Sequence, residues 1–225
     1  MKAFSMRLLS PLYYRSKIDS GAAGATVTST WIGDLALLYA FNQSLGLKFI
    51  KFGYSSHRPK YEQIIDIGLL ASVAIPRRDI VKTKVFDIAT NFSSEGYVNT
   101  NAIGKSARAS FRNWNKRQGL APDNEFVFVT MSMNDGLELP DEFTIRIGNT
   151  KECLAHCKEI ALKDINNITL NAYTLSLILG RETLMEKLGK LRDAKQKFIE
   201  YNSPQYVLIR NFPLNEISSL LDTYN

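Results

Sequence analysis

Histidine and cysteine are scarce in this 225-residue chain, which contains two of each. Two cysteines are too few for a disulfide scaffold, and both stand with His156 in one short motif, Cys153-Leu-Ala-His-Cys157. A closed zinc site needs about four ligands, and the other histidine, His57, is remote in sequence. We therefore expect two small buried thiols and no metal site, and the lack of imidazoles disfavours hydrolase mechanisms that need a histidine base.

Several other signatures are missing. The sequence has no HExxH, GxSxG or GxGxxG motif, and Gly104-Lys105-Ser106 lacks the upstream glycine of a phosphate-binding loop, so we expect neither a catalytic constellation nor a cofactor. No apolar run is long enough to span a bilayer, and the N-terminus lacks the apolar segment of a secretory signal. The expectation is a cytoplasmic protein without a membrane partner.

Acidic residues are absent from the stretch Gly96 to Pro122, which we call the basic stretch. It carries five cations, a formal charge of +5 in a chain of net charge +6: Lys105, Arg108, Arg112, Lys116 and Arg117. Aromatic and amide side chains lie among them: Phe111, Trp114, Asn113, Asn115 and Gln118. Cations neutralise phosphates, aromatic rings stack on bases and amides read base edges. The pattern predicts a nucleic-acid-binding element, and a solvated surface segment anchored by its aromatic residues is the alternative.

The local structure of the basic stretch is open at this level. If residues 103–117 are helical, four of the cations fall on one face. Its glycines, Gly96, Gly104 and Gly119, favour a flexible protruding arm equally well.

Hydrophobic periodicity predicts an α+β fold. Strands are expected at 2–14, 69–75, 81–90, 125–131, 143–147 and 206–210, and helices at 31–45, 181–201 and 215–224. Thr30 is expected to cap the first helix, and residues 151–163 fit either a strand or a helix. Helices on a largely antiparallel sheet indicate one ferredoxin-like or RNA-recognition-type domain over 1–225, with 93–122 as a basic insertion.

Four blocks of the sequence, in order and spacing, resemble a known family. They are Tyr13-Tyr14-Arg15-Ser16-Lys17 after the first strand, Asp34 to Ala40, Gly104-Lys105-Ser106 with Asn113 to Gly119 behind it, and Pro140 through Arg146-Ile147-Gly148. Together they resemble the type I-D branch of the CRISPR-associated Cas-five superfamily, the cyano-subtype Csc-one proteins, over roughly residues 1–160. Asn149-Thr150 departs from the Lys-Trp that the family tends to have there.

The resemblance implies a non-catalytic subunit of an RNA-guided interference (Cascade) complex in antiviral defence, with a RAMP-type fold and a thumb-like insertion. Such a subunit binds the 5′ handle of the guide RNA, joins the backbone subunit to the large subunit, and meets target DNA indirectly. The implied RNA-binding residues are Tyr14, Arg15, Lys17, Lys105, Ser106, Arg108, Arg112, Trp114, Asn115, Lys116, Arg117 and Arg146. Two alternatives remain: a metal-independent repeat-RNA endonuclease that uses Tyr14, Lys17 or His57, and an adaptor that binds an acidic protein surface.

Overall fold

The fold was analysed in a computed structural model of the chain. The structure describes residues 1–14, 26–47, 61–89, 114–133, 137–148, 153–190, 199–203 and 205–221. No helix among these residues is long and apolar enough to cross a membrane.

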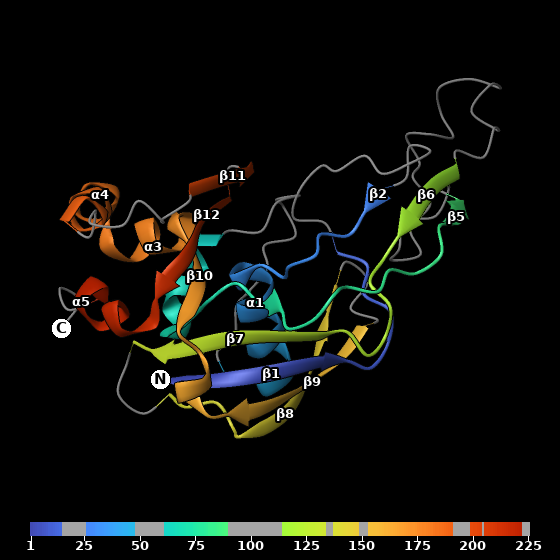
Figure 1. The fold of residues 1–225 in the computed structure, drawn as a ribbon, viewed down its shortest axis with the longest axis horizontal. Coiled ribbons are helices and arrows are strands. Elements are labelled where there is room, and N and C mark those ends of the chain that lie inside the picture. The colour runs from blue at the N-terminus through green and yellow to red at the C-terminus, as the bar shows by residue number, and fades with distance from the viewer. Residues whose placement is uncertain are drawn as a thin grey trace.

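A six-stranded sheet, here the main sheet, forms the centre of the molecule (Figure 1). Its strands are β1 (Lys2–Leu8), β3 (Leu69–Ala71), β4 (Ile75–Pro76), β7 (Glu125–Ser132), β8 (Glu142–Ile147) and β9 (Cys153–Ile160). The order is β3-β7-β1-β9-β8, β4 also pairs with β7, and every pairing is antiparallel. The segment that sequence left ambiguous is therefore the strand β9, and β1 lies between β7 and β9.

Helix α1 (Asp34–Leu45) covers one face of the main sheet. Alternation along β1 sends Phe4, Met6 and Leu8 to this face, where they are fully buried, as a half-buried strand requires. The ring centroids of Phe41 and Phe128 lie 5.6 Å apart, so the helix packs directly on the sheet. The predicted helix is confirmed except at its start: Gly33 is the N-cap, with no side-chain cap, so the capping prediction for Thr30 was wrong.

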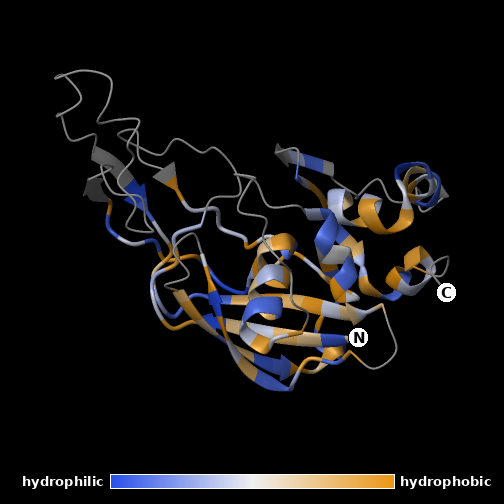
Figure 2. Ribbon diagram, turned by 180° about the vertical axis from the view of Figure 1, so that it is seen from behind, coloured by the Kyte–Doolittle hydropathy of each residue, from blue (hydrophilic) through white to orange (hydrophobic). Residues whose placement is uncertain are grey.

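A C-terminal unit packs on part of the opposite face (Figures 1 and 2). It contains the sheet β10 (Asn167–Asn171), β12 (Tyr206–Pro213) and β11 (Ile199–Ser203), with helices α3 (Ala172–Leu179), α4 (Arg181–Lys190) and α5 (Ile217–Leu221). The described residues also form three short 3-10 helices: η2 (Tyr61–Ile67), η4 (Leu162–Asp164) and η5 (Leu214–Glu216). Ala3, Val129 and Met131 of the main sheet share one buried cluster with the residues of this unit.

A buried polar cluster joins α1 to the C-terminal unit. Asp34 is fully buried, the Asn171 side-chain amide donates to its Oδ1 at 2.9 Å, and the Thr174 hydroxyl donates to its Oδ2. Asn171 also donates to the carbonyl of Gln205 at 3.0 Å. Burial raises the pKa of Asp34 to about 6, and the two side-chain hydrogen bonds oppose that rise. Asp34, in the first turn of α1, therefore connects two parts of the fold.

A third, smaller sheet consists of β2 (Thr26–Val27), β6 (Trp114–Gln118) and β5 (Phe86–Ala89), in the order β2-β6-β5. It lies apart from the main sheet in Figure 1. β5 and β6 pair antiparallel, and β2 pairs parallel with β6.

Several secondary-structure predictions need correction. The strand expected over 2–14 ends at Leu8, and of the strand expected over 81–90 only residues 86–89 form the strand β5. The helix expected over 181–201 is α4 as far as Lys190, and residues 199–203 form the strand β11. The helical alternative for 103–117 is wrong at its end, because residues 114–118 form β6. The strand expected over 69–75 is divided at Ser72 into β3 and β4. The α+β class, with helices on antiparallel sheet, is confirmed.

Candidate nucleic-acid interface

The basic stretch lies only partly within the described residues. Its cations Lys105, Arg108 and Arg112, together with Ser106, fall outside them, as do Arg15, Lys17 and most of the predicted insertion 93–122. The described part begins at Trp114 in β6, where Trp114, Asn115, Lys116 and Arg117 pair with residues 89 to 86 of β5. Residues 90–113 thus connect two paired strands. The RNA-binding roles of all these side chains remain predictions.

The C-terminal end of the basic stretch is fixed to the core by hydrogen bonds on both sides. On one side, the Gly119 amide donates to the Thr83 hydroxyl at 3.0 Å, and the Gln118 side chain donates to the Thr83 carbonyl at 3.1 Å. On the other side, Leu120 and Leu12 exchange backbone hydrogen bonds of 2.9 and 3.0 Å, and the Thr28 amide donates to the Gln118 carbonyl at 2.9 Å. We call these contacts the stem. The stem holds β6 between two segments that are remote in sequence.

Gly119 is required in the stem by close packing. A Cβ atom at this position would lie 2.5 Å from Cε1 of Tyr13 and 2.6 Å from the Leu12 carbonyl oxygen, distances that no side chain tolerates. The Tyr13 ring therefore rests on the backbone at the end of β6. From sequence alone, Gly119 was counted among the glycines that favour a flexible arm; close contact with Tyr13 is the physical reason for a glycine here.

Four exposed cations lie along the segment that leads from β4 to β5: Arg77, Arg78, Lys82 and Lys84, here called the cationic strip. Asp79 is the acidic residue within it. Lys82 forms an isolated bridge with Leu120, so the strip passes the stem. The cationic strip was not predicted, because residues 81–90 were assigned to an alternating strand; the excess of Lys and Arg over acidic residues was the available signal.

Tyr14 occupies a different environment from the one that its predicted role requires. Its side chain is 9% exposed, its hydroxyl lies 2.8 Å from that of Tyr206, and its amide donates to the Thr28 hydroxyl at 3.2 Å. Burial raises the pKa of Tyr14 far above its ordinary range. The buried ring has no open face for a base, so Tyr14 acts in this structure as a core residue.

Arg146 is exposed on β8, and its backbone amide donates to the Ser44 hydroxyl at the end of α1 at 3.1 Å. No described residue forms an ion pair with its side chain. Arg117 is half-buried in β6. The structure thus brings Arg117 next to the stem, whereas Arg146 lies on the edge strand of the main sheet.

Strand alternation places the side chains of the motif Cys153-Leu-Ala-His-Cys157 on two different faces of β9. Both cysteines are free and buried on the face of β9 that α1 covers, which confirms the buried thiols. His156 points to the other face, where its Nε2 lies 2.9 Å from a Glu142 carboxylate oxygen. The three side chains therefore cannot converge on one ion. Among the described residues, no group of three or more His, Cys, Asp or Glu side chains could hold a metal.

Comparison with known proteins gives one strong match. The family model described as "Type I-D CRISPR-associated protein Cas5/Csc1" matches residues 1–214. No curated protein matches the chain significantly. Among solved structures, similar chains include one from the type III-B Cmr-beta complex bound to cognate target RNA and AMPPnP, at 11% identity and a TM-score of 0.42, covering 99% of this chain and 89% of that one. A second, from Cmr-beta bound to cognate target RNA, has 11% identity and a TM-score of 0.43, covering 98% and 89%.

Proposed function

Because the chain belongs to the type I-D CRISPR-associated Cas5/Csc1 family, we propose that it is a non-catalytic subunit that binds the 5′ handle of the guide RNA. In this proposal it joins the backbone subunit to the large subunit of the interference complex and meets target DNA indirectly. The observation that carries the proposal is the basic stretch, with five cations and no acidic residue, fixed to the core at the stem.

The proposed architecture is an RNA-recognition-type fold in which residues 93–122 form a thumb-like insertion. The antiparallel main sheet with α1 on one face supports the first part. The pairing of β5 with β6 at the two ends of residues 90–113 supports the second, since an insertion leaves and rejoins the fold at neighbouring positions.

Phosphate contacts provide the affinity in this proposal. Lys105, Arg108, Arg112, Lys116 and Arg117 would position the guide, while Trp114 stacks on a splayed base. The stem supports such a role because it fixes β6 on both sides, and a rigid base limits the ordering entropy lost when RNA binds. The endonuclease alternative gains nothing from Tyr14, whose buried hydroxyl is bonded to Tyr206.

The test is a titration of labelled single-stranded repeat RNA, against a scrambled RNA of equal length, with the triple variant K105A/R108A/R112A. We expect weaker binding and a salt dependence whose slope falls by about 2, since each phosphate contact to a single strand contributes about 0.7 to it. The matched control is K163A/R181A, which removes two exposed cations from the C-terminal unit and should leave RNA binding unchanged. An unchanged slope in the triple variant would contradict the assignment of the basic stretch.

The same samples, run on a denaturing gel with and without EDTA, separate the alternatives. Uncut RNA that binds tightly, depends on salt and prefers the repeat supports handle binding. Cleavage without metal would favour the endonuclease. Salt-insensitive assembly with protein subunits in the absence of RNA would favour the adaptor.

A further inference from the structure

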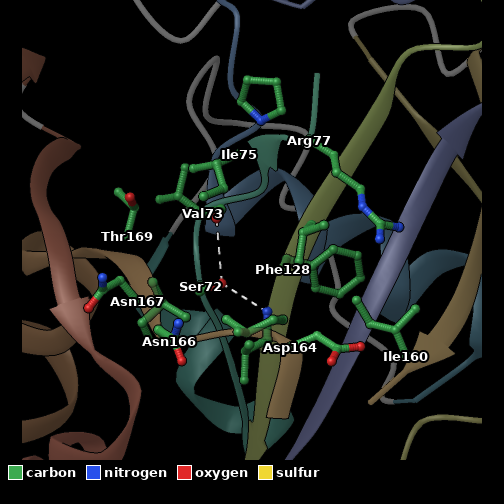
Figure 3. A pocket seen from close by; sticks show the side chains of 15 residues that line it. Ser72, Val73, Ile75, Arg77, Phe128, Ile160, Asp164, Asn166, Asn167 and Thr169 are labelled. Carbon is green, nitrogen blue, oxygen red and sulfur yellow. Dashed lines mark hydrogen bonds between the residues drawn. The ribbon is translucent and has the colours of Figure 1, made fainter. Parts of the chain in front are cut away.

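A cavity of about 240 Å³ opens between the main sheet and the segment that enters the C-terminal unit (Figure 3). Aliphatic side chains from both sides form its walls: Ile75, Val127, Ile160, Ile165 and Ile168. The side chains of Arg77, Asp164, Asn166 and Asn167 lie around them. The cavity therefore combines apolar walls with polar groups of several kinds, as small ligand sites do.

An irregularity in the strands explains why this space exists. The Ser72 amide donates to the Val129 carbonyl at 2.8 Å, and the Ser72 hydroxyl accepts from the Val129 amide at 2.9 Å. The side chain thus takes the place of a backbone acceptor, and the chain turns away from β7 for the next two residues. Val73 then pairs with Thr169 of β10. Pairing with β7 resumes at Ile75. Such bulges frequently adjoin functional sites.

The polar groups of the cavity have free bonding capacity. Arg77, Asp164, Asn166 and Asn167 are all exposed, and none of their side chains forms a hydrogen bond or an ion pair within the described part of the chain. A guanidinium, a carboxylate and two amides offer both donors and acceptors. They can therefore bond the edge of a ligand whose faces contact the aliphatic walls.

The cavity is continuous with the cationic strip. Arg77 belongs to both, and Arg78, Lys82 and Lys84 extend the exposed positive charge from the cavity to the stem. A polyanion that contacts the basic stretch therefore has a favourable path to the cavity.

We propose that this cavity binds one unpaired nucleobase of the RNA strand held by the basic stretch, an inference that rests on the proposed function. A base has two apolar faces, a polar edge and an adjoining phosphate. Val127, Ile160 and Ile165 contact its faces, Asp164 and the two asparagines bond its edge, and Arg77 neutralises its phosphate. An aliphatic side chain of a protein partner would fill the walls but leave the polar groups without partners.

The test uses the full chain and two labelled oligonucleotides of equal length, single-stranded RNA and a strand of the same charge that lacks its bases. The variant V127F fills the cavity and changes no charge. We expect it to lower the affinity for RNA about tenfold, the size of one lost base contact, and to leave the abasic affinity and the salt slope unchanged. The control M185F enlarges a residue of α4 that is 61% exposed and lines no part of the cavity; it should behave as wild type.

A second variant, N166A/N167A, changes two exposed side chains and keeps the test valid if V127F does not fold. We expect it to alter the preference among A, C, G and U homopolymers.

A folded V127F that binds RNA like wild type would overturn the cavity assignment and leave the proposed function standing. An unchanged base preference in N166A/N167A would do the same. If V127F no longer bound a protein subunit while its RNA affinity stayed intact, the cavity would be assigned to a protein side chain instead. Failure of the wild-type chain to bind either strand would overturn both proposals.

Discussion

The hydroxyl groups of Tyr14 and Tyr206 lie 2.8 Å apart, although 192 residues separate them in sequence. Both side chains are buried, at 9% and 7% exposure, and the Tyr206 ring meets Trp31 edge to face at 5.2 Å. The segment after β1 and the C-terminal unit are therefore parts of one packed core. Residues beyond 160 thus complete the interior of the N-terminal part.

The Tyr14–Tyr206 contact should be visible in stability. Tyr14→Phe leaves the buried Tyr206 hydroxyl without this partner, so we expect the free energy of unfolding to fall by about 1 kcal/mol in urea titrations. Tyr206→Phe is the matched change. The double variant should cost less than the sum of the two single variants, because the second change removes a hydroxyl that has already lost this partner. Strictly additive costs would mean that the hydroxyls do not interact.

Asp34 should give the protein an unusual dependence on pH. Its pKa in the folded state is about 6, above the value near 3.9 of an unfolded chain. The folded state then binds the proton more tightly, so the contribution of Asp34 to stability is largest at low pH. It is lost as pH rises from about 4 to about 6, by about 3 kcal/mol in all.

The variant Asp34→Asn isolates this effect, because an amide keeps the shape and can still bond both Asn171 and Thr174. We expect its stability relative to wild type to increase between pH 4 and pH 6 and to level off above, as measured by urea unfolding at each pH. Asp141→Asn is a control of opposite sign in a lower pH range. The hydrogen bond from Lys2 holds the pKa of Asp141 below its usual range, so that variant loses relative stability as pH rises to about 4 and changes little above. If the free energies of unfolding of wild type and Asp34→Asn changed in parallel with pH, the raised pKa of Asp34 would be contradicted.

Strands with one buried face could be predicted from sequence, because alternation reports burial directly. β1, β7 and β8 were found in this way. The C-terminal part of the helix expected over 181–201 was not predicted correctly. Ile199 to Ser203 pairs with β12, and this tertiary pairing overrides the helical period of the sequence. Asp34 was placed correctly on its helix, but its partners Asn171 and Thr174 lie more than a hundred residues away. A sequence pattern carries no signal for such a contact.

The candidate nucleic-acid interface was predicted from composition, and its binding role stays a prediction. The basic stretch stands out through its missing acidic residues, yet its stem depends on Thr83, Thr28 and Leu12, which have no unusual local pattern. Tyr14 was selected because its block, Tyr13 to Lys17, resembles the family. Sequence could not show that these two adjacent tyrosines lie in different environments. Tyr14 packs in the core, whereas Tyr13 lies against Gly119.

The two cysteines should be unreactive while the protein is folded. Burial raises the pKa of Cys153 to about 11 and that of Cys157 to about 12, and the thiolate is the reactive form. We expect iodoacetamide at pH 8 to label neither residue appreciably in native protein, and both rapidly in denaturant, as followed by mass spectrometry. Native protein that reacts at the denatured rate would show that β9 does not bury them.

The two tryptophans should separate binding from folding. Trp31 is 6% exposed in the core, so Trp31→Ala should lower the free energy of unfolding by about 3–5 kcal/mol. Trp114 lies in β6, within the basic stretch; if it stacks on a base, Trp114→Ala should weaken binding of single-stranded RNA by about 1–3 kcal/mol and leave urea unfolding nearly unchanged.

Fluorescence provides an independent measurement of the same prediction. In a Trp31→Phe variant, Trp114 is the remaining indole, so its emission alone responds to RNA. Stacking on a base should quench that emission, and the quenching should follow the binding isotherm and reverse at high salt together with the complex. A Trp114→Ala protein that fails to fold would instead place this ring in the core. The RNA contact of the basic stretch would then depend on its cations and amides alone.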